Sequence, residues 1–196
     1  MRLRKSLLVL TAVMLPVASI ALLEGTAFAK KVTGAGHTVC SFGGTINFSP
    51  PLSSAGTAGV KKEVTTVDAS LGTCSGGTPV GSASSVAVKP IKTKVAKGQN
   101  AGTCSSFESN SSTITVKVKV NWVGEKPSKF SVAGLHPAVN GDGEVGFTGS
   151  FAVGGSYAGE GSLGVYLTPA STTAIGTCSG SISQLSIDRS NSSGTL

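Results

Sequence analysis

The ten residues Thr113–Trp122 read TITVKVKVNW, and this stretch decides the fold class. Apolar residues occupy every second position along it: Ile114, Val116, Val118, Val120 and Trp122. A period of two is that of a β-strand with one buried face and one solvent-exposed face. The pattern therefore predicts that Trp122 lies in the core and that Lys117 and Lys119 share the exposed face.

The same signals recur on both sides of this strand. The turn sequence GEKPS at 124–128 separates it from a returning strand, KFSVAGL, at 129–135. Short apolar alternations also recur before and after this pair, near residues 45–49, 64–71, 85–95, 145–151, 163–167 and 182–187. Pro50 ends the first of these, and Pro90 interrupts the third, where proline favours an edge or a bulge. No later stretch has a helical period, so we expect an all-β antiparallel sandwich or barrel of about eight strands.

The first 29 residues have the pattern of an export signal. Arg2, Arg4 and Lys5 precede an apolar run at 7–23, and the small-x-small sequence Ala-Phe-Ala at 27–29 follows it. We expect cleavage after this sequence, a secreted mature chain over 30–196 with a single all-β domain, and no transmembrane segment after cleavage. Two similar phrases, LGTCSGG at 71–77 and IGTCSGS at 175–181, suggest related halves at 30–100 and 101–188, with chance similarity as the alternative.

The four cysteines all follow the predicted signal, and an even number in an exported chain predicts two disulfides. If the strands run up and down in sequence order, Cys40 and Cys74 reach one end of the sheet and Cys104 and Cys178 reach the other. That order favours the pairs Cys40–Cys74 and Cys104–Cys178, whereas crossed Greek-key connections would allow the other pairings. No C-x-x-C pair is present, so a metal site on the cysteines is not expected.

Catalytic patterns are weak in this sequence. His37, Asp68 and Ser75 run in the order of a trypsin-like triad, but the acid and the serine are too close together in sequence for that fold. Asp142 and Glu144 are too few for a calcium site. We therefore predict no catalytic, cofactor-binding or metal-binding residues and no cofactor, with an uncharacterised hydrolase as an alternative.

Lysine is concentrated in one segment, because residues 89–129 contain eight lysines and two glutamates. If the strands that carry them are neighbours, the lysines form one basic face that attracts anionic envelope polymers or lipid head groups. The alternative is that lysine only keeps an exposed strand soluble. The face has no arginine or interleaved aromatic residue, so nucleic acid is not an expected partner. The candidate residues are Lys89, Lys92, Lys94, Lys97, Lys117 and Lys119.

Two motifs carry a resemblance: CSFGGTINFSPPL at 40–52 and LGTCSGG at 71–77. The chain resembles a group of small secreted β-rich proteins of actinobacteria, which share a leading cysteine, a G-T-I-x-F-S-P-P-L strand end and later C-S/T-G-G cysteines. The resemblance implies export and disulfide bonding. It implies no activity and no site residue.

These patterns together predict a secreted, non-catalytic protein with a binding or surface-interaction role at the cell envelope. The second alternative, beside the hydrolase, is an exported inhibitor or toxin-like module that acts through the loop VGEKPSK at 123–129, where Lys126 would make the contact. The sequence determines neither the ligand nor the oligomeric state.

Overall fold

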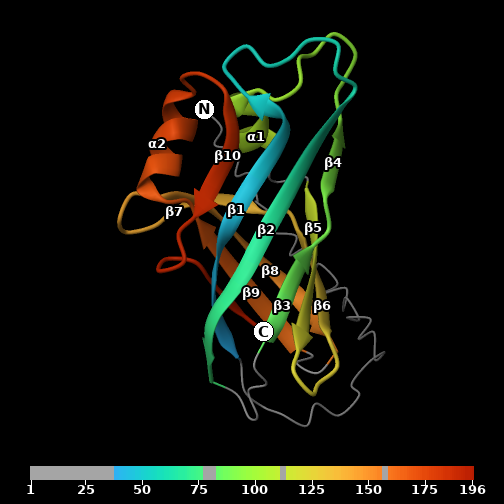
Figure 1. Ribbon diagram of the computed structural model, residues 1–196, viewed down its shortest axis with the longest axis vertical. Helices are drawn as coiled ribbons and strands as arrows, with labels where there is room; N and C mark the ends of the chain where they lie inside the picture. The colour runs from blue at the N-terminus through green and yellow to red at the C-terminus, as the bar shows by residue number, and fades with distance from the viewer. Residues whose placement is uncertain (1–37, 77–82, 111–113, 156–158) are drawn as a thin grey trace, which may run out of the picture. The chain divides into compact units, whose positions relative to one another are not determined.

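The computed structural model describes residues 38–76, 83–110, 114–155 and 159–196, which form an all-β fold with two short helices (Figure 1). The predicted signal at 1–29 and His37 lie outside the described residues. The first strands and helix are β1 (Val39–Leu52), β2 (Lys62–Ser75), β3 (Ala83–Val88), β4 (Ile91–Lys94) and α1 (Cys104–Asn110). The next strands are β5 (Thr115–Trp122), β6 (Ser128–Ala133), β7 (His136–Val139), β8 (Val145–Gly154) and β9 (Gly159–Tyr166). The last elements are α2 (Pro169–Thr177), β10 (Ile182–Ile187) and β11 (Ser193–Thr195).

All the described strands belong to one antiparallel sheet, which curves into a half-barrel (Figure 1). The strand order is β3-β5-β6-β8-β9-β11-β1-β2-β4, and β10 and β7 pair additionally with β1 and β8. The sheet has eleven strands where the sequence predicted about eight, and it does not divide into the two facing sheets of a sandwich. The order is also not the up-and-down succession assumed from the sequence, because β1 lies between β2 on one side and β10 and β11 on the other.

The two ends of this strand order are consecutive in the chain. β3 pairs with β5 as far as Val88 opposite Val118, whereas β4 pairs with β2 from Ile91 opposite Thr65. Only Lys89 and Pro90 separate the two pairings. Proline has no N–H to donate to a ladder, so Pro90 marks the point at which the segment changes partners. Residues 83–94 thus join one end of the sheet to the other.

β1 is longer than the sequence predicted, because it continues through Pro50 and Pro51 to Leu52. The Ser49–Pro50 bond is cis. Pairing with β10 stops after Asn47 and resumes at Leu52 opposite Ile182. The prolines interrupt the ladder instead of ending the strand, and pairing with β2 stops just before them at Ser49 opposite Val64.

The alternation in β5 has the predicted consequence for the core. Val116, Val118, Val120 and Trp122 are buried, and the residues between them are exposed or half-buried. Trp122 is 5% exposed, and its Nε1–H donates to Ser128 Oγ at 2.9 Å. The prediction that Trp122 is a core residue is confirmed.

The two helices correct the expectation that no helix is present. α2 begins with Pro169 after Thr168, whose Oγ1 accepts from the Ser171 N–H. The helix has nine residues and buries only Ser171 and Ile175, so it is too short for a helical period to stand out in the sequence. Its start signal, threonine followed by proline, is present in the sequence.

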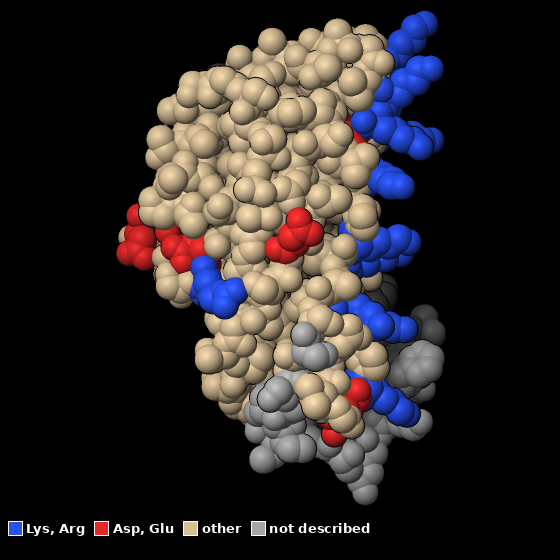
Figure 2. Space-filling view, in the orientation of Figure 1, with Lys and Arg blue, Asp and Glu red and all other residues tan. Residues whose placement is uncertain are grey.

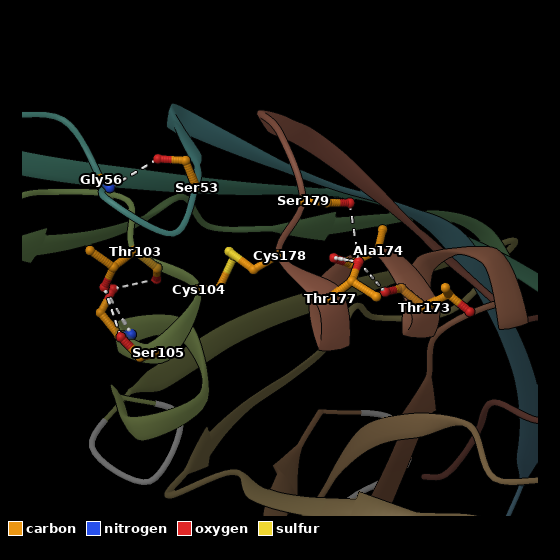
Figure 3. The surroundings of a disulfide bond; sticks show 11 residues. Ser53, Gly56, Thr103, Cys104, Ser105, Thr173, Ala174, Thr177, Cys178 and Ser179 are labelled. Atoms are coloured by element: carbon orange, nitrogen blue, oxygen red, sulfur yellow. Dashed lines mark hydrogen bonds between the residues drawn. A yellow bond between two sulfur atoms is a disulfide. The ribbon is translucent and has the colours of Figure 1, made fainter.

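The structure joins Cys40 to Cys74 and Cys104 to Cys178, which is the pairing that the sequence favoured. Cys40 and Cys74 are opposite each other in the β1–β2 ladder, with Cα atoms 4.0 Å apart. Cys104 begins α1 and Cys178 caps the end of α2, as Figure 3 shows. The second pair therefore joins two helix ends, not the strand ends that the sequence suggested.

The repeated phrases around the cysteines have different structures. Residues 72–75 of the first phrase are part of strand β2, whereas residues 175–177 of the second end helix α2. Cys178 follows in the left-handed conformation with φ of 46°. The phrases share glycine and serine beside a disulfide, but their described residues differ in secondary structure.

Candidate functional site

Three of the candidate lysines lie on adjacent strands at one end of the sheet order. Lys117 and Lys119 are on the exposed face of β5, as predicted. The Lys89 N–H donates to the Lys117 carbonyl at 2.9 Å, immediately after β3. The condition that the lysine-bearing segments be neighbours is therefore met for β5 and for Lys89, which directly follows the neighbouring strand β3.

β4 is placed differently from what the sequence suggested, because it pairs with β2 and not with β5. Its lysines, Lys92 and Lys94, nevertheless line the same surface hollow as Lys89 and Lys117. This hollow, here called the β4 hollow, has a volume of about 390 Å³. Lys97 is exposed beyond the end of β4 and does not line it.

Two further lysines belong to this surface and were missed in the sequence. Lys129 of β6 lies directly opposite Lys119, and Lys62 of β2 lies directly opposite Lys94. Lys129 could have been found, because a short turn after a regular strand fixes the register of a hairpin. Lys62 could not have been found, because the sequence does not show that the chain changes partners at Pro90 and that β4 therefore pairs with β2.

The seven residues Lys62, Lys89, Lys92, Lys94, Lys117, Lys119 and Lys129 are called the lysine face below. Figure 2 shows basic side chains gathered along one side of the molecule, whereas most of the acidic side chains in that view lie elsewhere. A second hollow, called the β5 hollow, has a volume of about 670 Å³ and is lined by Lys89, Lys117, Lys119 and Lys129. Within the described ranges, none of the seven lysines makes an ion pair with a carboxylate.

The inward face of the same strands borders an apolar cavity of about 130 Å³. Val86 and Val88 of β3 and Val116 and Val118 of β5 contribute to its wall. Among the described residues that line it, Thr65 alone has a polar side chain. Sequence periodicity identified the inward face of β5, but it could not show that the interior leaves a space unfilled.

The acidic residues Asp142 and Glu144 lie apart from the lysine face, in the turn between β7 and β8. Glu144 is 3% exposed, and its Oε2 accepts from Asn140 Nδ2 at 2.8 Å and from Asn191 Nδ2 at 2.7 Å. Amide donors already occupy this carboxylate, which therefore holds the turn together. No group of three metal-ligating side chains occurs in the part of the chain that the structure describes.

Among the described residues, Asp188 is the titratable group whose pKa is clearly shifted by its surroundings. Hydrogen bonds from the Ser190 hydroxyl and from the Ser190 backbone N–H hold the pKa of this carboxyl below its ordinary value of 3.8. These bonds stabilise the charged form, since a carboxylate accepts more strongly than a carboxylic acid. They close a turn after β10.

The other residues considered from the sequence are dispersed. His136 is exposed at the start of β7. Asp68 accepts a hydrogen bond from Asn47 Nδ2 at 2.9 Å, and the neighbour of Ser75, Cys74, is in a disulfide. In the loop at 123–129, Lys126 is exposed.

Comparisons with protein-family models, with curated proteins and with solved structures found no match for this chain. No helix in the described ranges is long and apolar enough to cross a membrane.

Proposed function

We propose that this is an exported, non-catalytic protein that binds anionic groups of the cell envelope through the lysine face. The observation that supports it best is the convergence of seven lysines, from β2, β4, β5, β6 and the link between β3 and β4, on neighbouring strands and hollows. The two disulfides are compatible with export, because such bonds persist in oxidising compartments.

The arrangement is unfavourable for the isolated protein. Lys119 opposite Lys129 and Lys62 opposite Lys94 place like charges directly across a ladder, which destabilises a sheet. A bound polyanion offsets this repulsion and gains attraction from each ammonium group. The lysine ammonium group acts as a point charge, unlike the planar guanidinium group of arginine. The face can therefore bind phosphate or carboxylate groups in more than one geometry.

Protection of a free sheet edge does not explain Lys119 and Lys129, which have ladder partners on both sides. β5 and β6 both have neighbours on each side, because β5 lies between β3 and β6, and β6 lies between β5 and β8. Lysines that blunt an edge belong on a terminal strand. Of the lysine pairs on this face, only Lys94 opposite Lys62 includes a strand at an end of the order.

Co-sedimentation tests the proposal with vesicles that contain phosphatidylglycerol and with neutral phosphatidylcholine vesicles. A polyphosphate column tests the polymer alternative in the same way. We expect retention on the anionic material that falls steeply between about 50 and 500 mM salt, because the screening length shortens to a few ångströms. The double variant Lys119→Gln, Lys129→Gln should lose most of the retention at low salt.

A matched control separates the face from the net charge. The double variant Ala170→Glu, Ser183→Glu lowers the net charge by the same two units at exposed positions of α2 and β10. We expect this control to bind almost as well as the native protein. Retention that does not change with salt concentration would contradict a specific role for the lysine face, and so would an equal loss of retention in both double variants.

A further inference from the structure

We propose that the ligand of this face is an anionic amphiphile with a single slender apolar chain. Its charged head binds the lysines of the β4 hollow, and its chain passes between β4 and β5 into the apolar cavity. The inference rests on the proposed function, and it specifies which class of anionic ligand the face takes.

The opening follows from the change of partners at Pro90. β3 pairs with β5 up to Val88, and β4 then leaves β5 to pair with β2 (Figure 1). The last contact of this segment with β5 is the Lys89 N–H bond to the Lys117 carbonyl. The start of β5, at Thr115 and Val116, therefore has no ladder partner on that side within the described ranges.

Two isoleucines border both this opening and the interior. Ile91 and Ile114 line the β4 hollow on the outside, and both also line the apolar cavity. Both side chains are only half-buried. These two side chains lie between the hollow and the cavity, so a ligand chain that passes them would move along an apolar wall with lysines at its outer rim.

The chemistry of the cavity excludes a polar occupant. Thr65 is the single polar side chain among the described residues of its lining, so a buried water would lack the two to four partners that it needs. The volume of about 130 Å³ is close to the roughly 150 Å³ of a dry apolar cavity that accommodates benzene. A chain of about six carbons therefore matches the space in volume.

The position of the charges selects an anion at the head of that chain. The β4 hollow is lined by four lysines, Lys89, Lys92, Lys94 and Lys117, and by no acidic residue among those described. A ligand with its apolar part at Ile91 and Ile114 places its head among these ammonium groups. A neutral alcohol would fill the cavity and leave the lysines without a partner, and a bare phosphate would do the reverse.

Calorimetric titration of the native protein with ethyl, butyl, hexyl and decyl phosphate tests the inference directly. Each methylene that leaves water should tighten binding by up to about fourfold. We expect a gain of at least about tenfold from ethyl to hexyl phosphate and little further gain with decyl phosphate, because the cavity is then full. Equal affinity for ethyl and hexyl phosphate would overturn the inference.

A cavity-filling variant locates the chain. Ala69 lines the cavity from β2, so Ala69→Leu should remove most of the gain from ethyl to hexyl phosphate while vesicle binding is kept. Ala133→Leu makes the same change on the exposed face of β6 and should behave as the native protein. An unchanged gain in Ala69→Leu would contradict binding in this cavity. The chain-length series needs no variant, so it decides the question even if Ala69→Leu fails to fold.

Two further probes, 1-hexanol and inorganic phosphate, measure the separate contributions of the apolar chain and the charged head to binding. We expect hexyl phosphate to bind at least about tenfold more tightly than either probe alone. Tighter binding of hexanol than of hexyl phosphate would overturn the anionic identity of the ligand. If the alkyl series is flat while salt-sensitive vesicle binding remains, only this inference fails; if vesicle binding is also absent, the proposed function fails.

Discussion

At the scale of single residues, position on a strand matters more than residue type. Lys119 and Lys129 are ordinary exposed lysines whose effect comes from lying directly opposite each other. Asp188 is a half-buried acid whose pKa is lowered because Ser190 folds back to donate to it. In both cases the chemistry depends on a neighbour fixed by the fold.

Changing the sign of one lysine should therefore raise stability and reduce binding. In Lys129→Glu the new carboxylate faces Lys119, so a repulsive cross-strand pair becomes an attractive one. We expect the free energy of unfolding to rise by about 0.5–1 kcal/mol, measured by urea denaturation at low salt, while retention on anionic vesicles falls. A stability unchanged or lower than that of Lys129→Gln would show that the pair is not under electrostatic stress.

The pKa of Asp188 should respond to its serine partner. Because the folded pKa lies below the unfolded value, this carboxylate stabilises the protein above the unfolded pKa, and the contribution is lost as pH falls through the folded pKa. Ser190→Ala should raise the pKa toward 3.8, as followed by the carboxyl ¹³C shift of Asp188 between pH 2 and 6. An unchanged titration curve would assign the shift to another group.

At the scale of elements, the regular strands could be predicted from the sequence and the irregular ones could not. The alternation at 113–122 determines β5 and its buried face, and the turn at 124–128 determines the hairpin with β6. α2 is too short for its period to emerge, and the passage of β1 through two prolines depends on partners distant in sequence. An alternating pattern indicates local conformation and burial. Whether a proline ends a strand depends instead on whether a neighbouring strand needs a hydrogen bond from that position.

Each disulfide should contribute substantially to stability. The Cys104–Cys178 bridge closes 74 residues and the Cys40–Cys74 bridge closes 34, so the chain-entropy model gives about 4 kcal/mol for each. We expect the double variants Cys104→Ser, Cys178→Ser and Cys40→Ser, Cys74→Ser each to lower the free energy of unfolding by about 3–5 kcal/mol in urea denaturation. A loss below about 1 kcal/mol would mean that the segments held by the bridge are fixed by packing alone.

At the scale of the whole described fold, the sequence predicted that the sheet is antiparallel but not how it is ordered. Lys89, directly after β3, and the lysines of β5 could be assigned to one face once those strands were assumed to be neighbours. The inclusion of β4, Lys62 and the apolar cavity depends on one segment that pairs at both ends of the sheet. Which distant strands pair depends on how the whole interior packs, and the local alternation of apolar residues does not specify it.

β1 pairs on one side with β2, which follows it closely in the chain, and on the other with β10 and β11, at separations such as Gly44 to Ile187 and Val39 to Thr195. The loop that must close before the second set of contacts can form includes nearly the whole described chain. Closing such a long loop lowers the chain's conformational entropy before the stabilising contacts between its ends can form. This places the protein among slowly folding topologies. Of the pairings that β1 makes, only the hairpin with β2, which Cys40–Cys74 links, joins segments close in sequence and can form early. The other edge of β1 stays unpaired until β10 and β11 have folded against it.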